Sequence, residues 1–489
     1  MADVWREVLS SLAGRFSPAG GSAAAPGRVY LVGGAVRDLL IGRSPRDVDL
    51  LVEVAASDEP LVLREAAALS GMEPVLFDRR PPFTHRVVVE GVIVDLSFCR
   101  PGGLREALER RDFTFNAIAL PLASLLDELA GGGFSSTEAR AGIEKHLVDP
   151  FGGLDSLRAR RIRATSARSL DDDPLRMLRA VRLACTLPGF AIDEPLAASI
   201  RGAAARIAEP ATERVQAELD QILRSRRAGE ALRSMDALDL LAPLLPELEP
   251  LRGLKQPAHH HDYDALEHTL RAVETAEELA RGCAEVRLAA LGSEDEAVLK
   301  WAALFHDVGK AATATVDEDG ARHFYGHEAI SAALAEEAFA RLRVASRIAE
   351  PVVKLIDLHL RLGALAPAGT GDKPIRRLIR AAGELLPLLV LLSLADRRSA
   401  GGERAEEKEA ALLEICRRAL SLRVEVEAAV SAPPLLDGRD IMKILGLPPG
   451  PRVGSIARWL ERLRAEGSLT TREDSEALLR SLPPARTRD

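Results

Sequence analysis

The sequence predicts an α+β protein in which a head containing a β-sheet precedes a longer helical part. Two observations predict this division. Apolar runs typical of strands occur at Val29–Val32, Val48–Val52, His85–Glu90 and Val92–Phe98. Beyond residue 151 the apolar residues recur mostly at helical spacing. We expect an N-terminal helix and linker (1–27), the head (28–150), a helical neck (151–250), a second helical domain (251–400) and a helical tail (401–489).

Composition narrows the class of protein. A chain of 489 residues is long for one core, and a net charge of −8 means that a nucleic-acid contact needs a local basic surface. No apolar run approaches membrane-spanning length and the N-terminus lacks a signal-peptide layout, so we expect a cytoplasmic protein without a membrane partner. The cysteines, which show no CxxC spacing and so argue against disulfides and a zinc ribbon, are Cys99, Cys185, Cys283 and Cys416.

The stretch Tyr30–Glu53, YLVGGAVRDLLIGRSPRDVDLLVE, carries a pair of carboxylates. After a turn, Asp47 and Asp49 stand among apolar residues that read as a strand. Residues i and i+2 of a strand point to the same face, so the two carboxylates lie side by side. Like charges at that distance are costly unless a cation separates them, and Mg²⁺ prefers carboxylate oxygens together with substrate phosphates. The pair therefore predicts a site for two-metal phosphoryl or nucleotidyl transfer.

A glycine pair precedes these carboxylates. Gly33 and Gly34 end the first strand and let backbone N–H groups approach a triphosphate, while Arg37 on the following helix neutralises its charge. A DxD pair by itself is usually a solvated strand end. The GGxVRD motif ahead of it, at this spacing, favours the functional interpretation.

Two further segments add polar groups to the head. Asp95 lies in the second run of a predicted hairpin, where it is either a third carboxylate of the site or a structural residue. In the segment RRDFTFNAIA, Arg111 offers a cation for phosphate, and Asp112 and Asn116 offer groups for ribose hydroxyls. A surface ion pair is the alternative for the two charges.

A basic cluster and a helix start follow the head. Asp173-Pro174 is a good N-cap and N1 pair, so a helix is predicted to begin there, with Arg176 one turn from Asp173. The cluster is either a surface facing RNA phosphates or a solvated helix face. Its members proposed to contact RNA are Arg158, Arg160, Arg161 and Arg163.

The pairing of GGAVRD with RDVDL resembles the start of the tRNA nucleotidyltransferase and bacterial poly(A) polymerase family. The resemblance spans residues 28–480 and implies a polymerase-β-like head with a mixed β-sheet and helices, in which Asp47 and Asp49 hold two Mg²⁺ ions. It implies that RRDxxxNA lines the nucleotide pocket and that Asp173 and Arg176 recognise the incoming base. The resemblance also implies that Arg179 and Arg182 bind the nucleotide.

Base chemistry supports that assignment. A carboxylate and a guanidinium together match the exocyclic amino group and ring acceptors of cytosine and adenine. Uracil and guanine present a carbonyl and a ring N–H there, which leaves buried polar groups unpaired. Asp173 and Arg176 therefore predict CTP and ATP as substrates without a nucleic-acid template. In the same family comparison, Ala211–Arg224 resembles a neck helix that braces the base-reading helix.

Histidines on predicted helices dominate the next domain. A lone histidine on an apolar helix is usually packed, but imidazoles and carboxylates from several helices can converge on divalent cations, and a metal-activated water there would hydrolyse phosphate esters. The pattern resembles the HD phosphohydrolase domain. The ligands implied are His268, His306, Asp307 and Asp396 for one metal of unknown identity, with His327 and His359 completing a second. A decayed domain retained as an RNA-binding scaffold is the alternative.

The C-terminal part is predicted to be helical. We expect a charged linker at Arg397–Glu407, an amphipathic helix at Ala410–Val430, and a further turn and helix after Gly438 that packs or contacts RNA.

The resemblance implies template-independent addition of CMP and AMP to the 3′ end of tRNA, that is, synthesis or repair of its CCA end, with pyrophosphate released. The segment Phe98–Leu108 is short where members that add the whole CCA end are expected to carry a flexible loop, which hints at an enzyme that adds only CC. A dedicated A-adding enzyme and a poly(A) polymerase are further alternatives, although FDRRPPFTH stands where a polymerase should carry a GRRF-like element. A hydrolase of the HD class with a nucleotide-sensing head is the alternative from a different class.

Overall fold

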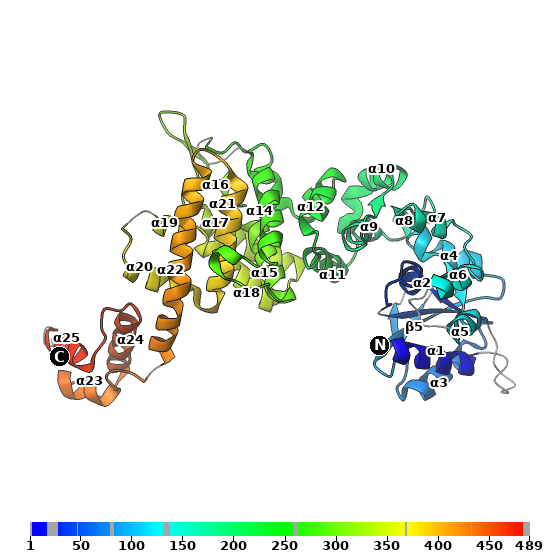
Figure 1. Cartoon of the computed structure of the whole chain (residues 1–489), viewed down its shortest axis with the longest axis horizontal. Coiled ribbons are helices and arrows are strands. Elements are labelled where there is room, and N and C mark those ends of the chain that lie inside the picture. Colours follow the sequence, from blue (N-terminus) through cyan, green and yellow to red (C-terminus); the bar gives the residue numbers. More distant parts are fainter. Residues whose placement is uncertain are drawn as a thin grey trace. The chain divides into compact units, whose positions relative to one another are not determined.

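The computed structural model describes residues 2–16, 28–45, 47–78, 83–130, 137–257, 263–366, 369–431 and 433–482. These residues form two compact units, Met1–Pro210 and Ala211–Asp489. The first holds the sheet of the head, and the second is helical apart from one short hairpin (Figure 1). The α+β class with a mixed sheet is confirmed. The predicted linker at 17–27 and part of FDRRPPFTH (79–82) lie outside the described residues.

The head is built on a six-stranded sheet of order β3-β4-β5-β2-β1-β6, in which β2 and β5 run parallel and the other neighbours antiparallel. Its strands are β1 (Arg28–Val32), β2 (Val48–Glu53), β3 (Val75–Asp78), β4 (Thr84–Val89), β5 (Val92–Cys99) and β6 (Ala119–Pro121). Strand β2 lies between β1 and β5, and its apolar residues are buried on both faces of the sheet.

The predicted hairpin is confirmed as β4 and β5. Glu90 (φ 51°) and Gly91 (φ 80°) form its two-residue turn, and positive φ at both positions is what the right-handed twist of such a hairpin requires. A core cluster that includes Tyr30, Val32 and Leu51 packs under the sheet against α4.

Helices surround the sheet and continue beyond it. The helices of the first unit are α1 (Ala2–Phe16), α2 (Gly33–Leu40), α3 (Glu59–Ser70), α4 (Leu104–Glu109), α5 (Leu122–Ala130), α6 (Thr137–Glu144), α7 (Gly153–Arg158), α8 (Ser169–Asp172), α9 (Arg176–Thr186) and α10 (Glu194–Ala203), with 3₁₀ turns at Thr114–Asn116 and Ala204–Ala208 and a small sheet of β7 (Arg161–Ile162) and β8 (Ala191–Ile192). The segment Phe98–Leu108, predicted to be a shortened loop, ends in α4, whose Leu108 is fully buried.

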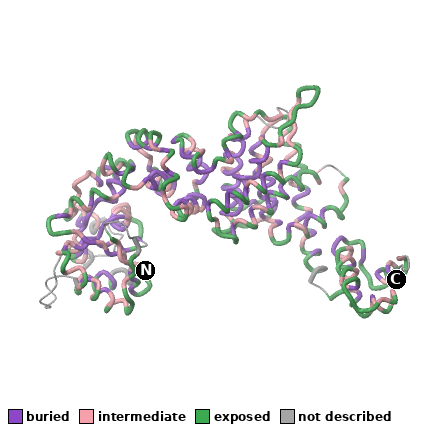
Figure 2. The backbone as a smooth tube through the Cα atoms, turned by 180° about the vertical axis from the view of Figure 1, so that it is seen from behind, coloured by how far each residue is buried: buried purple, intermediate pink, exposed green. Residues whose placement is uncertain are grey.

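The second unit begins with the predicted neck helix, α11 (Thr212–Leu223). Its other helices are α12 (Ala228–Ala237), α13 (Leu241–Leu244), α14 (Ala265–Leu279), α15 (Ser293–Phe305), α16 (Lys310–Thr313), α17 (His327–Leu342), α18 (Ser346–Leu358), α19 (Arg361–Leu365), α20 (Asp372–Ala382), α21 (Leu386–Ala400), α22 (Ala405–Ser431), α23 (Gly438–Leu445), α24 (Pro451–Ala465) and α25 (Arg472–Arg480), with 3₁₀ turns at Pro246–Leu251, Ala284–Val286 and Gly383–Leu385 and a hairpin of β9 (Thr315–Val316) and β10 (Arg322–His323). Buried residues concentrate inside this bundle, where α14 packs against α15 and α21 (Figure 2).

Two boundaries differ from the sequence prediction. Arg397–Glu407 is not a linker, because α21 continues to Ala400 and α22 already begins at Ala405. Helix α21 includes Arg397 and Arg398, and Arg398 forms ion pairs with Glu285 and Glu409.

One stretch differs from the expectation that no apolar run approaches membrane-spanning length. Asp372–Ala400 is long and apolar enough by composition to cross a membrane, but 67% of its most apolar window is buried inside the protein.

Candidate functional site

The sheet brings three carboxylates of the head together. Asp49 is the second residue of β2, and Asp47 lies two residues before it, just ahead of the strand. In the parallel pairing of β2 with β5, Asp49 stands directly opposite Asp95. Neighbours in register point to the same face of a sheet, so the three side chains share one face. Asp95 is therefore close enough to be a third carboxylate of the site, and that role stays a prediction.

The first glycine of the turn makes room for this cluster. Gly33 has φ +72°, a conformation that side chains with a Cβ rarely adopt. A Cβ at this position would lie 2.5 Å from Arg111 Nη1 and still closer to Asp49 Oδ2. Only glycine therefore allows the start of α2 to approach both side chains.

Arginines lie beside two of the three carboxylates. Arg86, opposite Asp95 on β4, donates hydrogen bonds from Nε (2.7 Å) and Nη2 (2.8 Å) to the two oxygens of Asp95. Arg111 Nη1 lies 3.8 Å from Asp49 Oδ2. Burial raises the pKa of Asp49, the Arg111 guanidinium opposes that rise, and the neighbouring Asp95 adds to it. The site is thus short of positive charge at Asp49, the condition that favours a cation.

A buried network joins α2 to α9 through the RRDFTFNA segment. Arg37 Nη1 donates to Asn116 Oδ1 (3.2 Å), Asn116 Nδ2 donates to Asp112 Oδ1 (2.9 Å), and Arg179 Nε lies 2.6 Å from Asp112 Oδ2. Asn116 and Asp112 are 2% and 7% exposed. Burial alone would raise the pKa of Asp112, but Arg179 and Asn116 hold it below its usual range. The segment therefore orients two of the predicted nucleotide-binding arginines.

The predicted base-reading residues lie beside this network, with one correction. Helix α9 begins at Arg176, not at Asp173-Pro174, and Asp173 is the extended residue that ends α8. Its carboxylate accepts from Leu175 N (3.3 Å), so it still caps the turn that leads into α9. Arg176 donates to the backbone oxygen and the hydroxyl of Ser169, both at 3.0 Å, and to the carbonyl of Arg110.

The remaining predicted positions are exposed or partly exposed. Arg182 follows Arg176 and Arg179 at helical spacing on α9, so the three arginines share one face. In the basic cluster, Arg158 pairs with Glu144 (2.8 Å) and Arg163 with Asp193 (3.2 Å). Arg160 and Arg161 are exposed. A role of this cluster in RNA binding stays a prediction.

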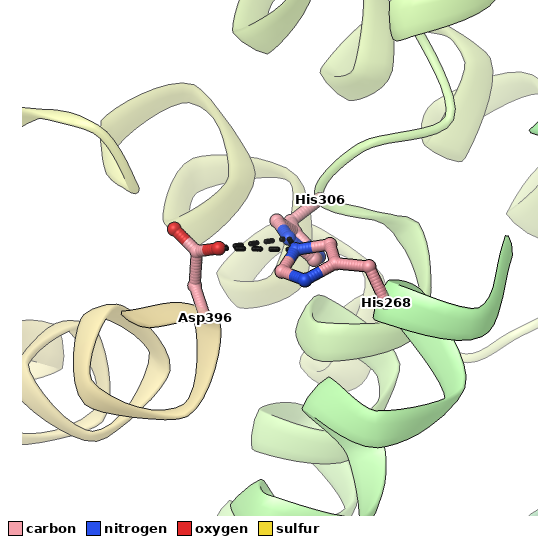
Figure 3. Close-up of side chains that lie close together, drawn as sticks. All are labelled: His268, His306 and Asp396. Carbon is pink, nitrogen blue, oxygen red and sulfur yellow. Dashed lines mark hydrogen bonds and ion pairs between the residues drawn. The ribbon is translucent and has the colours of Figure 1, made fainter. Parts of the chain in front are cut away.

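A second polar cluster lies inside the helical unit, where helix ends converge. Two groups of three residues have ligand atoms within 4.8 Å of one another: the first triad (His268, His306 and Asp396) and the second triad (Asp307, His327 and His359). Figure 3 shows Asp396 on α21 facing the imidazoles of His268 on α14 and of His306, with Asp396 Oδ1 3.1 Å and 3.7 Å from their Nε2 atoms. The six predicted ligands are therefore brought together from five segments, since His306 and Asp307 are adjacent.

Asp307, a member of the second triad, also contacts both histidines of the first triad. Its Oδ2 is 3.3 Å from His268 Nε2 and 3.2 Å from His306 Nε2, while its Oδ1 is 3.1 Å from His327 Nε2. Asp307 is 1% exposed, and the pKa of its carboxyl is held well below the usual range because His306 and Lys310 outweigh the effect of burial. A carboxylate in this position can bridge two metal ions.

The orientation of the imidazoles suits metal binding. Nδ1 of three histidines lies 2.6–2.8 Å from a backbone carbonyl three residues earlier: His306 with Ala303, His327 with Phe324 and His359 with Ile356. A carbonyl only accepts, so Nδ1 carries the proton and Nε2 points its lone pair to the centre. Burial opposes a charge on His306, yet Asp307 and Asp396 raise its pKa to about 10, so a proton supplies the cation when no metal does.

Sequence reasoning missed two of these neighbours. Arg86 could have been found by counting register across the hairpin, because a two-residue turn at Glu90-Gly91 pairs Arg86 with Asp95. Lys310 lies three residues after Asp307, and its Nζ is 2.6 Å from Asp307 Oδ2. Helical spacing marks such a contact, although not which residue type occupies it.

Three family models match parts of the chain: "Poly A polymerase head domain" at residues 29–70, "Probable RNA and SrmB- binding site of polymerase A" at 189–251, and "HD domain" at 265–401. The chain is 35% identical to an A-adding tRNA nucleotidyltransferase of Deinococcus radiodurans, over 93% of this chain and 95% of that protein. It is also 35% identical to a CC-adding tRNA nucleotidyltransferase of Thermus thermophilus, over 93% of each.

A solved structure shares the fold. The Thermotoga maritima CCA-adding enzyme complexed with tRNA superposes with a TM-score of 0.60 at 18% identity and covers 97% of this chain and 94% of that one. At this identity the likeness establishes the architecture of head, helical neck and helical body.

Proposed function

The chain belongs to the family of tRNA nucleotidyltransferases and poly(A) polymerases that carry an HD domain, and on this basis we propose that it adds CMP or AMP, taken from CTP or ATP, to the 3′ end of tRNA. No template strand takes part, and pyrophosphate leaves. The observation that carries the proposal is the parallel pairing of Asp49 with Asp95, beside Asp47 and under the Gly33 turn. The close relation in sequence to two tRNA-specific transferases supports the choice of acceptor.

The donor set fits magnesium. Asp47, Asp49 and Asp95 offer only carboxylate oxygens, which suit a hard cation that keeps part of its coordination for water and phosphate. Asp47 and Asp49 would hold two Mg²⁺ ions, and bound Mg²⁺ would supply charge for the attacking 3′-oxygen and the departing pyrophosphate. Arg37 and Arg111, at the edge of the cluster, would orient the triphosphate through charge-assisted hydrogen bonds.

Base selection would fall to Asp173 and Arg176. Arg176 is held against the backbone of Ser169 and Arg110, so its position is set before a nucleotide arrives. Preorganisation of this kind favours a fixed pattern of donors and acceptors, and CTP and ATP share the pattern that the pair complements. Selection by protein groups alone removes the need for a template.

Within the family we favour addition of part of the CCA end. Two relatives at 35% identity, one A-adding and one CC-adding, cover 93% of this chain, whereas several multifunctional CCA proteins at 30–34% identity cover 68–83% of it. Helix α4 occupies the segment after β5, which leaves little free chain there for a switching loop. Complete CCA synthesis and poly(A) addition are the competing specificities.

The experiment is an incorporation assay with Mg²⁺ and tRNA transcripts that end before CCA, after C and after CC, each supplied with CTP, ATP or both. Extension that stops at CC identifies a CC-adding enzyme, and extension of only the CC-ended transcript by one A identifies an A-adding enzyme. Full CCA addition contradicts the partial specificity but keeps the transferase. Absence of incorporation by both the unaltered chain and Asp49→Asn would reject the transferase proposal.

We propose a second activity, metal-dependent hydrolysis of phosphate esters, at the HD centre. The proposal rests on the two triads, which Asp307 connects. The Nε2 atoms of their histidines face the carboxylates of Asp307 and Asp396 or one another. Imidazole and carboxylate ligands suit transition-metal ions, and such an ion lowers the pKa of a bound water. Release of nitrophenol from a chromogenic phosphodiester, with Mn²⁺, Co²⁺ or Ni²⁺ added to metal-free protein, tests the activity. Hydrolysis that survives His306→Ala would contradict it.

A further inference from the structure

The imidazole of His268 is anchored differently from the other three. Those histidines donate from Nδ1 to the carbonyl three residues earlier in their own turn of helix. The corresponding carbonyl for His268 is that of Ala265, which accepts the hydroxyl of Thr269 at 2.8 Å. Nδ1 of His268 instead lies 3.2 Å from the hydroxyl of Ser399, on a different helix.

The hydrogen-bond geometry assigns the protons. Ser399 Oγ lies 2.8 Å from the backbone carbonyl oxygen of Asp396, which can only accept, so the single hydroxyl proton of Ser399 points there. The lone pairs of Ser399 Oγ are then left to accept from Nδ1–H of His268. Nε2 of His268 then faces the carboxylates of Asp396 and Asp307, at 3.1 Å and 3.3 Å, where a metal ion would take the place of its proton.

Burial makes the anchor hard to replace. Ser399 is 4% exposed and His268 is 0% exposed, so bulk water does not reach the contact. Helix α21 thus supplies the ligand Asp396 of the first triad and, one turn later, Ser399, which contacts His268 of that triad. The second triad needs no such partner, because His327 and His359 are oriented by their own backbone.

We propose that Ser399 is a positioning residue of the first triad, which fixes the tautomer and orientation of His268 and so sets the affinity of that triad for a divalent metal ion. The inference rests on the metal site proposed for the HD domain. Loss of a partner of this kind typically lowers metal affinity by roughly 10–100-fold. The effect should be confined to one of the two metal positions.

The test is titration of Co²⁺ alone into the metal-free full-length chain by calorimetry, with visible absorption to report coordination. All variants carry Asp47→Ala and Asp49→Ala so that the head carboxylates do not contribute. Ser399→Ala removes the acceptor and Ser399→Thr keeps it. Ser393→Ala is the matched control, because Ser393 is a buried serine of the same helix whose hydroxyl bonds the carbonyls of Leu389 and His359 and no imidazole nitrogen.

We expect two binding events in the parent chain, with one weakened roughly 10–100-fold by Ser399→Ala, restored by Ser399→Thr and unchanged in Ser393→Ala. Thermal unfolding of the metal-free variants checks that each is folded. If Ser399→Ala unfolds, the Ser399→Val and Ser399→Thr chains provide the same comparison, because valine and threonine have nearly the same size and only threonine carries a hydroxyl. Equal isotherms for the parent and Ser399→Ala, or equal weakening by Ser393→Ala, overturn the inference while leaving the metal site intact. A parent chain that binds no Co²⁺ overturns the metal site itself and the inference with it.

Discussion

The head and the HD centre both gather carboxylates, but they neutralise them differently. In the head, Asp49 and Asp95 stand on a sheet, and arginine side chains provide the nearby positive charge. In the HD centre, Asp307 is enclosed by imidazoles and Lys310, and it is almost fully buried. The Asp49 side chain retains 33% of its exposure, whereas that of Asp307 retains 2%.

This difference teaches what each site is built to hold. An open, all-oxygen cluster leaves coordination positions for water and a triphosphate, so metal and substrate can arrive together. A closed cluster of nitrogen and oxygen ligands completes most of the coordination from the protein and suits a resident metal. The first arrangement is typical of nucleotidyl transfer and the second of a hydrolytic centre.

The largest effects are expected when each site is disabled separately, which tests whether the two sites act independently. Asp49→Asn should lower nucleotide incorporation by at least ~10²–10³-fold, because it removes a charge that the transition state requires. It should leave Co²⁺ binding in the HD centre unchanged. His306→Ala should do the reverse. Incorporation of labelled nucleotide into tRNA and cobalt calorimetry measure the two. Loss of both functions in either variant would show that the sites are not independent.

The Gly33 turn gives the next largest effect. Gly33→Ala should lower incorporation by about 10²-fold, because the new Cβ displaces Asp49 and Arg111, and a side chain at positive φ costs a further 1–3 kcal/mol or so. Gly71→Ala is the matched control: Gly71 has φ +69° but no atom within 4 Å of the new Cβ. Incorporation assays with thermal unfolding separate the two contributions. Equal loss of activity in both variants would mean that backbone strain alone is responsible.

Metal binding in the HD centre should depend on pH. With a pKa of about 10, His306 is protonated at pH 7 in the metal-free protein, and an imidazole must lose that proton to bind a metal. Binding therefore releases a proton, and the apparent affinity falls by about tenfold for each pH unit below 10. Calorimetry in two buffers of different ionisation enthalpy measures the released proton. A binding enthalpy that is independent of the buffer would contradict the prediction.

The smallest effect concerns Arg86, the arginine that forms an ion pair with Asp95. Arg86→Gln should raise the affinity of the head for Mn²⁺ by about fivefold, because a partly exposed ion pair contributes about 1 kcal/mol that the metal no longer has to overcome. Electron paramagnetic resonance of free Mn²⁺ measures the affinity in a chain that carries His306→Ala. Arg100→Gln, which breaks the exposed pair with Glu106, should have no effect. Weaker binding by Arg86→Gln would mean that the arginine positions Asp95 for the metal.

Local patterns accounted for much of the fold and of the head. Alternation on either side of Gly91 predicted the hairpin, and the i, i+2 rule placed Asp47 and Asp49 on one face. Errors arose where a helix continued beyond its predicted end, as in α21, or where a helix began later than predicted, as in α9, whose N-cap is Leu175, two residues after Asp173. The resemblance to a family supplied the six HD ligands, which their spacing along the chain could not bring together.

The sequence by itself determined which elements hold the candidate residues: the glycine turn, the strand with the paired aspartates and the helices with the histidines. These elements depend on interactions between residues a few positions apart, which propensity and periodicity describe. Only the tertiary structure decided that Arg86 pairs with Asp95 and that Asp307 of the second triad contacts His268 of the first. It also decided that Ser399 orients His268, which lies 131 residues away in the sequence. Such contacts follow from the packing of whole strands and helices, because it is their registry that places distant side chains within hydrogen-bonding distance.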